Sequence, residues 1–292
     1  MNQPAMTGEP MGGKQASMRT AGLWTYRELL RQLVVRDLKA RYKVSVLGFF
    51  WSLLRPLLTI AVLAAVFSYF QIPRGRYAVD YPFLLMAAYL PWFYFSATFL
   101  EGTHSILANG NLVKKVYCPR EVFPTAVVGA QLVNFLLALL VLVPVLYLLS
   151  DARPGWAILQ LPLVIAVHTA FLLGLCLAAS VLNVLFRDTT QITEFLAFIW
   201  FYLSPVLYGV DLVYSEFGAL SLLYMLNPMA GILEWYRYSL LGSALSQSSE
   251  FAWLNGWVFW GAIPYSILMS LLALGLGFWL LRTTQSKAVD QL

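Results

Sequence analysis

Charged residues are scarce in this chain of 292 residues: 11% are Asp, Glu, Lys or Arg, whereas 60% are hydrophobic. A soluble globular domain has about 25% charged and about 45–50% apolar residues. This composition therefore leaves too few polar side chains to cover a soluble domain. The mean hydropathy of +0.71 and the long apolar runs predict an all-α integral membrane protein.

Cysteine and histidine are also rare. The chain has two cysteines, Cys118 and Cys176, and two isolated histidines, His104 and His168. Nothing in their spacing indicates a disulfide, and metal sites need clustered ligands. We therefore expect no metal site and no cofactor bound by this chain.

Residues 1–22 lack the apolar core and cleavage site of a signal peptide, and they predict a disordered cytoplasmic tail. The stretch Gly8-Glu-Pro-Met-Gly-Gly-Lys-Gln15 is close to the P-loop pattern G-x-x-x-x-G-K-[ST]. A P-loop needs a preceding strand and a Ser or Thr hydroxyl for magnesium, and Gln15 has no hydroxyl. We interpret the match as chance and expect no ATP hydrolysis by the chain alone.

Residues 23–45 predict an amphipathic helix, because apolar residues from Leu23 onward recur at three- and four-residue spacing with basic residues between them. A basic amphipathic helix just before a membrane span is typical of the membrane interface, where anionic headgroups attract it. A soluble helix packed on a partner would show the same pattern. We favour the interface helix.

The apolar runs predict six membrane spans, since the hydrocarbon core needs about 20 apolar residues per helix. The expected spans are Trp51–Phe70, Pro82–Leu100, Phe123–Leu149, Leu159–Phe186, Phe195–Val210 and Trp257–Leu281. The segment 219–241 is apolar but is interrupted by Asn227-Pro228, Gly231, Glu234 and Arg237. It predicts two short re-entrant or interfacial helices between spans five and six.

Positive charge predicts the orientation, since Lys and Arg are retained in cytoplasmic loops. With the N-terminus inside, 15 of the 19 Lys and Arg residues fall on the cytoplasmic side. Both termini, including a tail over residues 283–292, are therefore expected in the cytoplasm. Arg55 is followed by Pro56, and we expect it at the cytoplasmic boundary with its guanidinium among the headgroups.

The loop over residues 110–121 predicts a short amphipathic helix on the cytoplasmic side. Leu112 with Val116, and Val113 with Tyr117, lie one helical turn apart, and Pro119 ends the helix. Such a helix suits docking into a groove on a partner protein. An ordinary positively charged loop would show the same spacing, so the spacing alone leaves both interpretations open.

Several motifs in a fixed order resemble the permease subunits of polysaccharide-exporting ABC transporters, the type 2 exporters of O-antigen, teichoic acid or related lipid-linked glycans. They are Arg36-Asp-Leu-Lys-Ala-Arg-Tyr-Lys43, Val46-Leu-Gly-Phe-Phe-Trp-Ser-Leu-Leu-Arg-Pro-Leu57, Asn111-Leu-Val-Lys-Lys-Val-Tyr-Cys-Pro-Arg-Glu121, Phe186-Arg-Asp188 and Trp200-Phe-Tyr-Leu-Ser-Pro205. The resemblance runs from Leu23 to Arg282. Cys118 stands where many relatives have phenylalanine, a conservative change that leaves docking intact.

The resemblance implies a six-span permease domain over residues 46–282 that pairs as a homodimer in the bacterial inner membrane. It also implies two copies of a separate ATPase subunit, which bind ATP and Mg. Residues 186–188 would lie near that ATPase. The loop 110–121 would be the coupling helix, carried by Leu112, Val113, Lys114, Lys115, Val116, Tyr117, Pro119, Arg120 and Glu121.

A lipid-linked glycan offers a diphosphate and sugar rings to its transporter. Arginine binds phosphate through its bidentate fork, so the diphosphate or the lipid headgroups would meet Arg36, Lys39, Arg41, Lys43 and Arg55. Aromatic rings hold apolar sugar faces, and the candidate channel residues are Trp92, Phe93, Tyr94, Phe95, Trp200, Tyr202, Tyr208, Trp235, Tyr236 and Tyr238. Positive-inside anchoring and an interfacial aromatic belt would explain the same residues without any substrate.

Three other functions compete with polysaccharide export. An efflux permease for a small hydrophobic molecule would share the six-span plan. A membrane-embedded glycosyltransferase would need clustered carboxylates or a His/Asp pair, but Asp80, Asp151, Asp188 and Asp211 fall in four different loops. A secondary transporter would have interrupted helices in both halves. We therefore expect an exporter permease without a catalytic site, which contacts membrane lipids and no nucleic acid.

Overall fold

The structure is a computed structural model that describes residues 26–42, 46–69, 80–115, 118–150, 155–186, 188–217, 224, 226–245 and 261–289. These residues form helices and turns and no β-strand. The helices are α2 (Arg27–Tyr42), α3 (Val46–Tyr69), α4 (Tyr81–Ala108), α5 (Gly110–Lys115), α6 (Val122–Leu149), η2 (Trp156–Gln160), α7 (Leu161–Leu185), α8 (Thr189–Tyr202), α9 (Val210–Phe217), α11 (Pro228–Leu245) and α13 (Ile263–Val289).

Four helices in the described ranges are long and apolar enough to cross a membrane: Tyr81–Ala108, Val122–Leu149, Trp156–Leu185 and Ile263–Thr284. They overlap the second, third, fourth and sixth predicted spans. The apolar part of α3, Leu54–Tyr69, is shorter, and α8 has only 14 residues. The prediction of an all-helical, multi-pass membrane protein is therefore confirmed, while the count of six stays a prediction.

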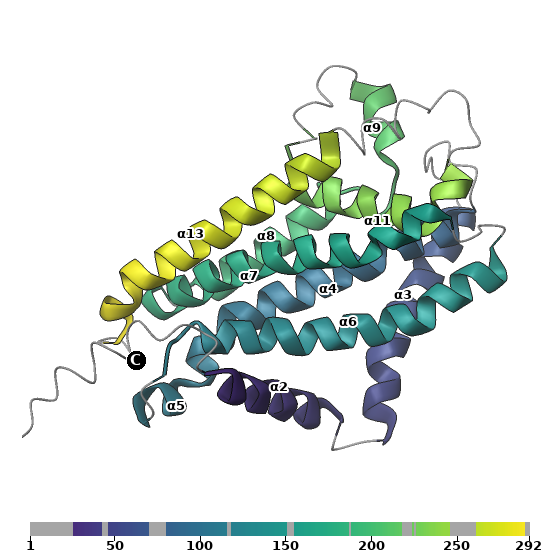
Figure 1. Ribbon diagram of the computed structural model, residues 1–292. Helices are drawn as coiled ribbons and strands as arrows, with labels where there is room; N and C mark the ends of the chain where they lie inside the picture. Colours follow the sequence, from purple (N-terminus) through teal and green to yellow (C-terminus); the bar gives the residue numbers. More distant parts are fainter. Residues whose placement is uncertain are drawn as a thin grey trace, which may run out of the picture.

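The long helices run alongside one another as a bundle (Figure 1). At its centre is α4, which packs against α3, α6, α7, α8 and α11. Most of its apolar side chains are buried, including Leu85 and Phe95. In contrast, α13 packs mainly on α7 and leaves Leu272 and Trp279 exposed. Exposed apolar surface of this kind is typical of contact with lipid or another membrane helix.

The contact between α7 and α13 depends on glycine. A Cβ atom on Gly174 would lie 2.3 Å from the carbonyl carbon of Ala273, and a Cβ atom on Gly277 would lie 2.2 Å from the carbonyl oxygen of Gly174. Both contacts are with backbone, which cannot move aside. Small residues allow this close approach of helix backbones, on which packing in membranes depends because lipid is as apolar as the side chains.

The fifth predicted span, Phe195–Val210, is not one helix. In the structure α8 starts earlier, at Thr189, and ends at Tyr202, and the chain turns before α9 begins at Val210. Pro205 disfavours the helical conformation at Ser204. The Asn227 Nδ2 donates to the carbonyl oxygen of Leu203 at 2.8 Å and to the Ser204 Oγ at 3.0 Å. These bonds give a hydrogen-bond donor to the carbonyl oxygen of Leu203 and to the hydroxyl of Ser204 in the turn after α8.

The segment 219–241 is also more helical than expected. Of this segment the structure describes 224 and 226–241. The predicted break at Asn227-Pro228 is confirmed, because α11 begins at Pro228 and the Met229 N–H donates to Asn227 Oδ1 at 3.0 Å. Gly231, Glu234 and Arg237, which interrupt the apolar run in the sequence, lie within α11, and the helix continues through all three. Glu234 and Arg237 pair with each other, so neither charge interrupts the helix.

The helix α2 falls within the range 23–45 that the sequence predicts as amphipathic. It packs against α6 and α3, and Leu33 is its buried anchor. Its basic residues stay exposed, including Arg36 and Lys39. Figure 1 shows α2, α5 and the C-terminal end of α13 at the same end of the bundle, whereas α9 and α11 lie toward the other end.

Candidate functional site

A cavity of about 600 Å³ lies between α2, α3, α4 and α6. This volume is within the range of about 300–1,000 Å³ of small-molecule sites. Its walls combine apolar side chains with a small group of charged and amide side chains, and they are formed by Arg41, Arg55, Pro56, Leu90, Phe93, Tyr94, Ser96, Ala97, Leu100, Glu101, Gln131, Asn134, Phe135 and Ala138. Helices far apart in sequence thus build one site.

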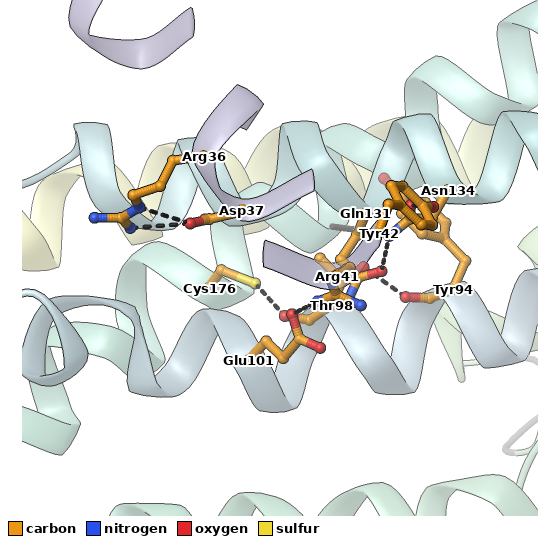
Figure 2. A network of polar contacts seen from close by, with 10 residues as sticks. All are labelled: Arg36, Asp37, Arg41, Tyr42, Tyr94, Thr98, Glu101, Gln131, Asn134 and Cys176. Carbon is orange, nitrogen blue, oxygen red and sulfur yellow. Dashed lines mark hydrogen bonds and ion pairs between the residues drawn. The ribbon is translucent and has the colours of Figure 1, made fainter. Parts of the chain in front are cut away.

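The charges in this cavity are two arginines and one carboxylate. Arg41 of α2 forms an ion pair with Glu101 of α4, which Figure 2 shows from close by. Arg55 is exposed, and no carboxylate of the described residues pairs with it. The positive charge exceeds the negative charge, so the cavity favours an anion.

The other basic residues of the predicted diphosphate or headgroup set lie elsewhere. Arg36 donates to Asp37 Oδ1 at 2.9 Å (Figure 2) and to Asn109 Oδ1 at 2.9 Å, and it does not line the cavity. Lys39 is exposed and does not line this cavity; it lines a separate surface pocket along α2 together with Arg36. Lys43 lies outside the described residues. Of the described members of this set, Arg41 and Arg55 are therefore the two that line the cavity.

A chain of polar side chains crosses from α2 to α6 at the cavity. The Tyr42 hydroxyl donates to Asn134 Oδ1, and Asn134 Nδ2 donates to Gln131 Oε1 at 3.2 Å. Figure 2 shows these side chains gathered beside Arg41. Sequence reasoning missed this group, because neutral amides within an apolar run have no charge or motif to mark them.

Most of the predicted channel aromatics on α4 and α11 lie inside the protomer rather than on a surface. The side chains that are at most 5% exposed are Trp92, Tyr94, Phe95, Trp235 and Tyr236. Tyr94 stacks on Phe135 with ring centroids 4.6 Å apart. Trp235 Nε1 donates to Gln160 Oε1 at 2.8 Å. In this structure these rings stabilise the core of the bundle.

The remaining aromatics are more accessible. Phe93 is half-buried and lines the cavity. Tyr202 is 55% exposed at the end of α8. The Tyr208 hydroxyl donates to the carbonyl oxygen of Tyr202 at 2.7 Å. Trp200 is half-buried, and its Nε1 donates to Asn227 Oδ1 at 2.8 Å. Tyr238 is half-buried on α11.

The segment 110–121 contains a short helix, as predicted, but at Gly110–Lys115. Leu112 is exposed and Val113 is half-buried. The residues that the structure describes do not include Val116, Tyr117 or the side chains of Lys114 and Lys115. Cys118 and Pro119 follow without helical structure. Burial raises the pKa of the Cys118 thiol, although Arg120 opposes the shift.

At the end of this segment Glu121 faces inward. Its Oε1 accepts a hydrogen bond from the Arg282 Nε of α13 at 3.0 Å, and the Glu121 side chain is 11% exposed. This pair links the start of α6 to α13. Glu121 is therefore not on the outer surface of the segment, in contrast to Leu112.

A buried ion pair lies within α11. Arg237 and Glu234 are each within 1% of full burial and pair across one helical turn. Arg237 Nη2 also donates to the carbonyl oxygen of Val206 at 3.2 Å, and its Nε donates to that of Leu84 at 3.5 Å. The sequence marks Arg237 only as an interruption of an apolar run, whereas the structure buries it. The i, i+3 spacing of opposite charges is the signal in the sequence that indicates this pair.

In the parts of the chain that the structure describes, no group of three or more His, Cys, Asp or Glu could hold a metal ion.

A family model described as ABC-2 type transporter matches residues 28–241. The chain belongs to the ABC-2 type transporter family. The matched region begins in α2 and ends in α11, so it contains the cavity, α5 and the buried ion pair. It confirms the family resemblance that the sequence motifs indicate.

Curated relatives of this ABC-2 chain are named as export and transport proteins. It is 36% identical over 218 residues to the O-antigen export system permease protein RfbA of Myxococcus xanthus, covering 74% of this chain and 81% of the relative. It is 28% identical over 236 residues to the protein of the same name from Klebsiella pneumoniae, covering 79% and 87%. It is 20% identical over 271 residues to the polysialic acid transport protein KpsM of Escherichia coli, covering 92% and 98%.

Proposed function

We propose that this chain is the membrane-spanning permease of an ABC exporter that moves a lipid-linked polysaccharide, such as O-antigen, across the bacterial inner membrane. The observation that carries the proposal is the 36% identity, over most of both chains, to an O-antigen export permease. Relatives named for O-antigen and polysialic acid share a polysaccharide as cargo. The ATP is hydrolysed by a separate subunit, and this chain holds no catalytic site and no cofactor.

The permease crosses the membrane six times, with α3 and α8 as the two spans beyond the four long helices. A short helix can cross if a neighbouring turn is covered by protein, and Asn227 covers the turn after α8. The segment 219–241 forms the re-entrant part between spans five and six, and α11 supplies its second helix. Both termini are cytoplasmic, because the end of the bundle with α2 and α5 carries the basic residues.

The working assembly contains two copies of this chain and two copies of the ATPase. The outer face of α8 supports pairing, since Phe195 and Phe198 are 63% and 61% exposed and large apolar patches mark contact surfaces. The segment 110–121 docks on the ATPase through the exposed residues of α5. The inward-facing Glu121 contributes by fixing the segment to α13 rather than by direct contact.

The cavity between α2, α3, α4 and α6 receives the diphosphate of the lipid carrier. Arginine forks bind phosphate oxygens well, and Arg41 and Arg55 both line the cavity. A diphosphate would compete with Glu101 for Arg41. The sugar path is lined by Phe93, Trp200, Tyr202, Tyr208 and Tyr238, with Tyr94 in the cavity wall beside Phe93, because the other candidate aromatics are enclosed in the core.

Loss of the chain is expected to block polysaccharide export completely in the bacterium that encodes it. A deletion strain should lose its surface polysaccharide and accumulate the lipid-linked polymer on the cytoplasmic side. The measurement is surface labelling of the polymer beside extraction of the lipid-linked form. Restoration by the plasmid-borne chain is the control. Unchanged surface polysaccharide, with retention of small hydrophobic compounds instead, would favour an efflux permease.

A further inference from the structure

Among the residues that the structure describes, one buried polar atom at the cavity has no hydrogen-bond partner. Gln131 is 5% exposed, and its Nε2 has no hydrogen-bond partner among the described residues. The same side chain lines the cavity. A buried amide donor without an acceptor is unfavourable, and in native proteins such a group calls for an explanation.

The hydrogen-bond chain determines which end of the Gln131 amide is free. The Tyr42 hydroxyl donates to Asn134 Oδ1, so Asn134 turns its Nδ2 toward Gln131. Gln131 therefore accepts the bond from Asn134 with Oε1, and its Nε2 has no acceptor among the described residues. Asn134 and Gln131 lie three residues apart on one face of α6, which keeps them adjacent.

The location of this pair also indicates function. Both amides lie in α6, a helix whose sequence is otherwise strongly apolar from Val122 to Leu149. Polar groups inside a membrane helix are costly, and they are often retained for binding or transport. Gln131 and Asn134 share the cavity with Arg41 and Arg55, so a ligand held by the arginines would lie beside a free amide donor.

We infer that Gln131 is a specificity-determining residue that donates from Nε2 to an oxygen of the first sugar, while Arg41 and Arg55 hold the adjacent diphosphate. This inference rests on the proposed function. A sugar attached directly to a diphosphate presents hydroxyl and ring oxygens next to the phosphate charges. Asn134 and Tyr42 are positioning residues, because they orient the Gln131 amide without contacting the ligand.

The test compares two probes on the purified complex of this chain with its ATPase in lipid nanodiscs. One probe is a polyprenyl diphosphate, and the other is the same molecule carrying a single hexose. We expect wild type to bind the hexose form about fivefold more tightly, the ordinary contribution of one neutral hydrogen bond. In Gln131→Met this preference should disappear, with binding of the bare diphosphate unchanged.

Two further variants keep the comparison decisive. Tyr42→Phe keeps the ring but removes the hydroxyl that orients Asn134, and it should reduce the preference only in part. Ser96→Ala is the matched control, because the Ser96 hydroxyl also lies at the cavity but already donates to the Phe93 carbonyl oxygen at 3.2 Å. It should keep the wild-type preference.

The outcomes separate the inference from the function on which it rests. Equal binding of both probes by wild type, or a preference that survives Gln131→Met and Tyr42→Phe, overturns the role of Gln131 and leaves the exporter intact. Loss of the preference in Ser96→Ala to the same extent also overturns it. No binding of either probe by wild type overturns both the cavity assignment and the inference.

Discussion

Reversing both charges in Lys114→Glu with Lys115→Glu is expected to abolish export while the chain still inserts in the membrane. These lysines end α5, the short helix that carries the exposed Leu112. If α5 transmits the ATPase motion, two acidic side chains in place of basic ones repel the surface that the lysines meet. Like-charge contacts at an interface cost several kcal/mol. The measurement is surface polysaccharide in cells that express the variant.

The control for this variant reverses the same number of charges in the N-terminal tail, with Lys14→Glu and Arg19→Glu. That pair should export normally, because the tail is not expected to dock on the ATPase. Copurification of the ATPase with each variant distinguishes lost docking from lost transmission. Wild-type export by the Lys114/Lys115 variant would remove the coupling role of α5.

The second large effect is expected at the buried ion pair of α11. Arg237→Met removes the arginine that pairs with the buried Glu234 carboxylate, and breaking such a pair costs about 3–5 kcal/mol. The carbonyl oxygens of Leu84 and Val206 also lose a donor. Because these contacts join α11 to α4 and to the turn after α8, we expect a large loss of folded protein. Thermal unfolding of the detergent-purified chain measures it.

Two variants test the cause of this loss. Adding Glu234→Gln to Arg237→Met removes the uncompensated charge and should recover much of the stability. Arg282→Met removes the partner of Glu121 in a pair whose arginine is 66% exposed. Solvent screens the exposed arginine of this pair, although the Glu121 carboxylate is mostly buried. This variant should therefore lose less stability than Arg237→Met. An Arg237→Met chain as stable as wild type would show that the pair does not hold α11.

The sequence predicts the long apolar helices well, because length and hydropathy are local properties. The helices α4, α6, α7 and α13 therefore lie where the apolar runs place them. The burial of a side chain, in contrast, depends on helices that are distant in sequence. Since α4 is apolar on all sides, its sequence does not show that Trp92 and Phe95 face other helices rather than a channel or lipid. Their enclosure follows from α4 being central to the bundle.

The polar groups were harder to interpret for a related reason. Glu234 and Arg237 appear in sequence as charges that should break a helix, yet pairing across one turn lets α11 continue. Gln131 and Asn134 carry no charge and match no motif. Their place in the site is evident only from the structure, in which α2 brings Tyr42 and Arg41 beside them. Contacts between helices distant in sequence determine the site.

Reconstitution tests whether this chain translocates a lipid-linked polysaccharide with energy from a separate ATPase. The chain and its ATPase are placed in proteoliposomes, and the accessibility of a lipid-linked polysaccharide to an enzyme on one side only is followed. We expect the polymer to change sides when ATP is added, and to stay in place with the chain alone or without ATP. Translocation by the chain without its ATPase, or none by the complete complex with ATP, would show that the proposed function is wrong.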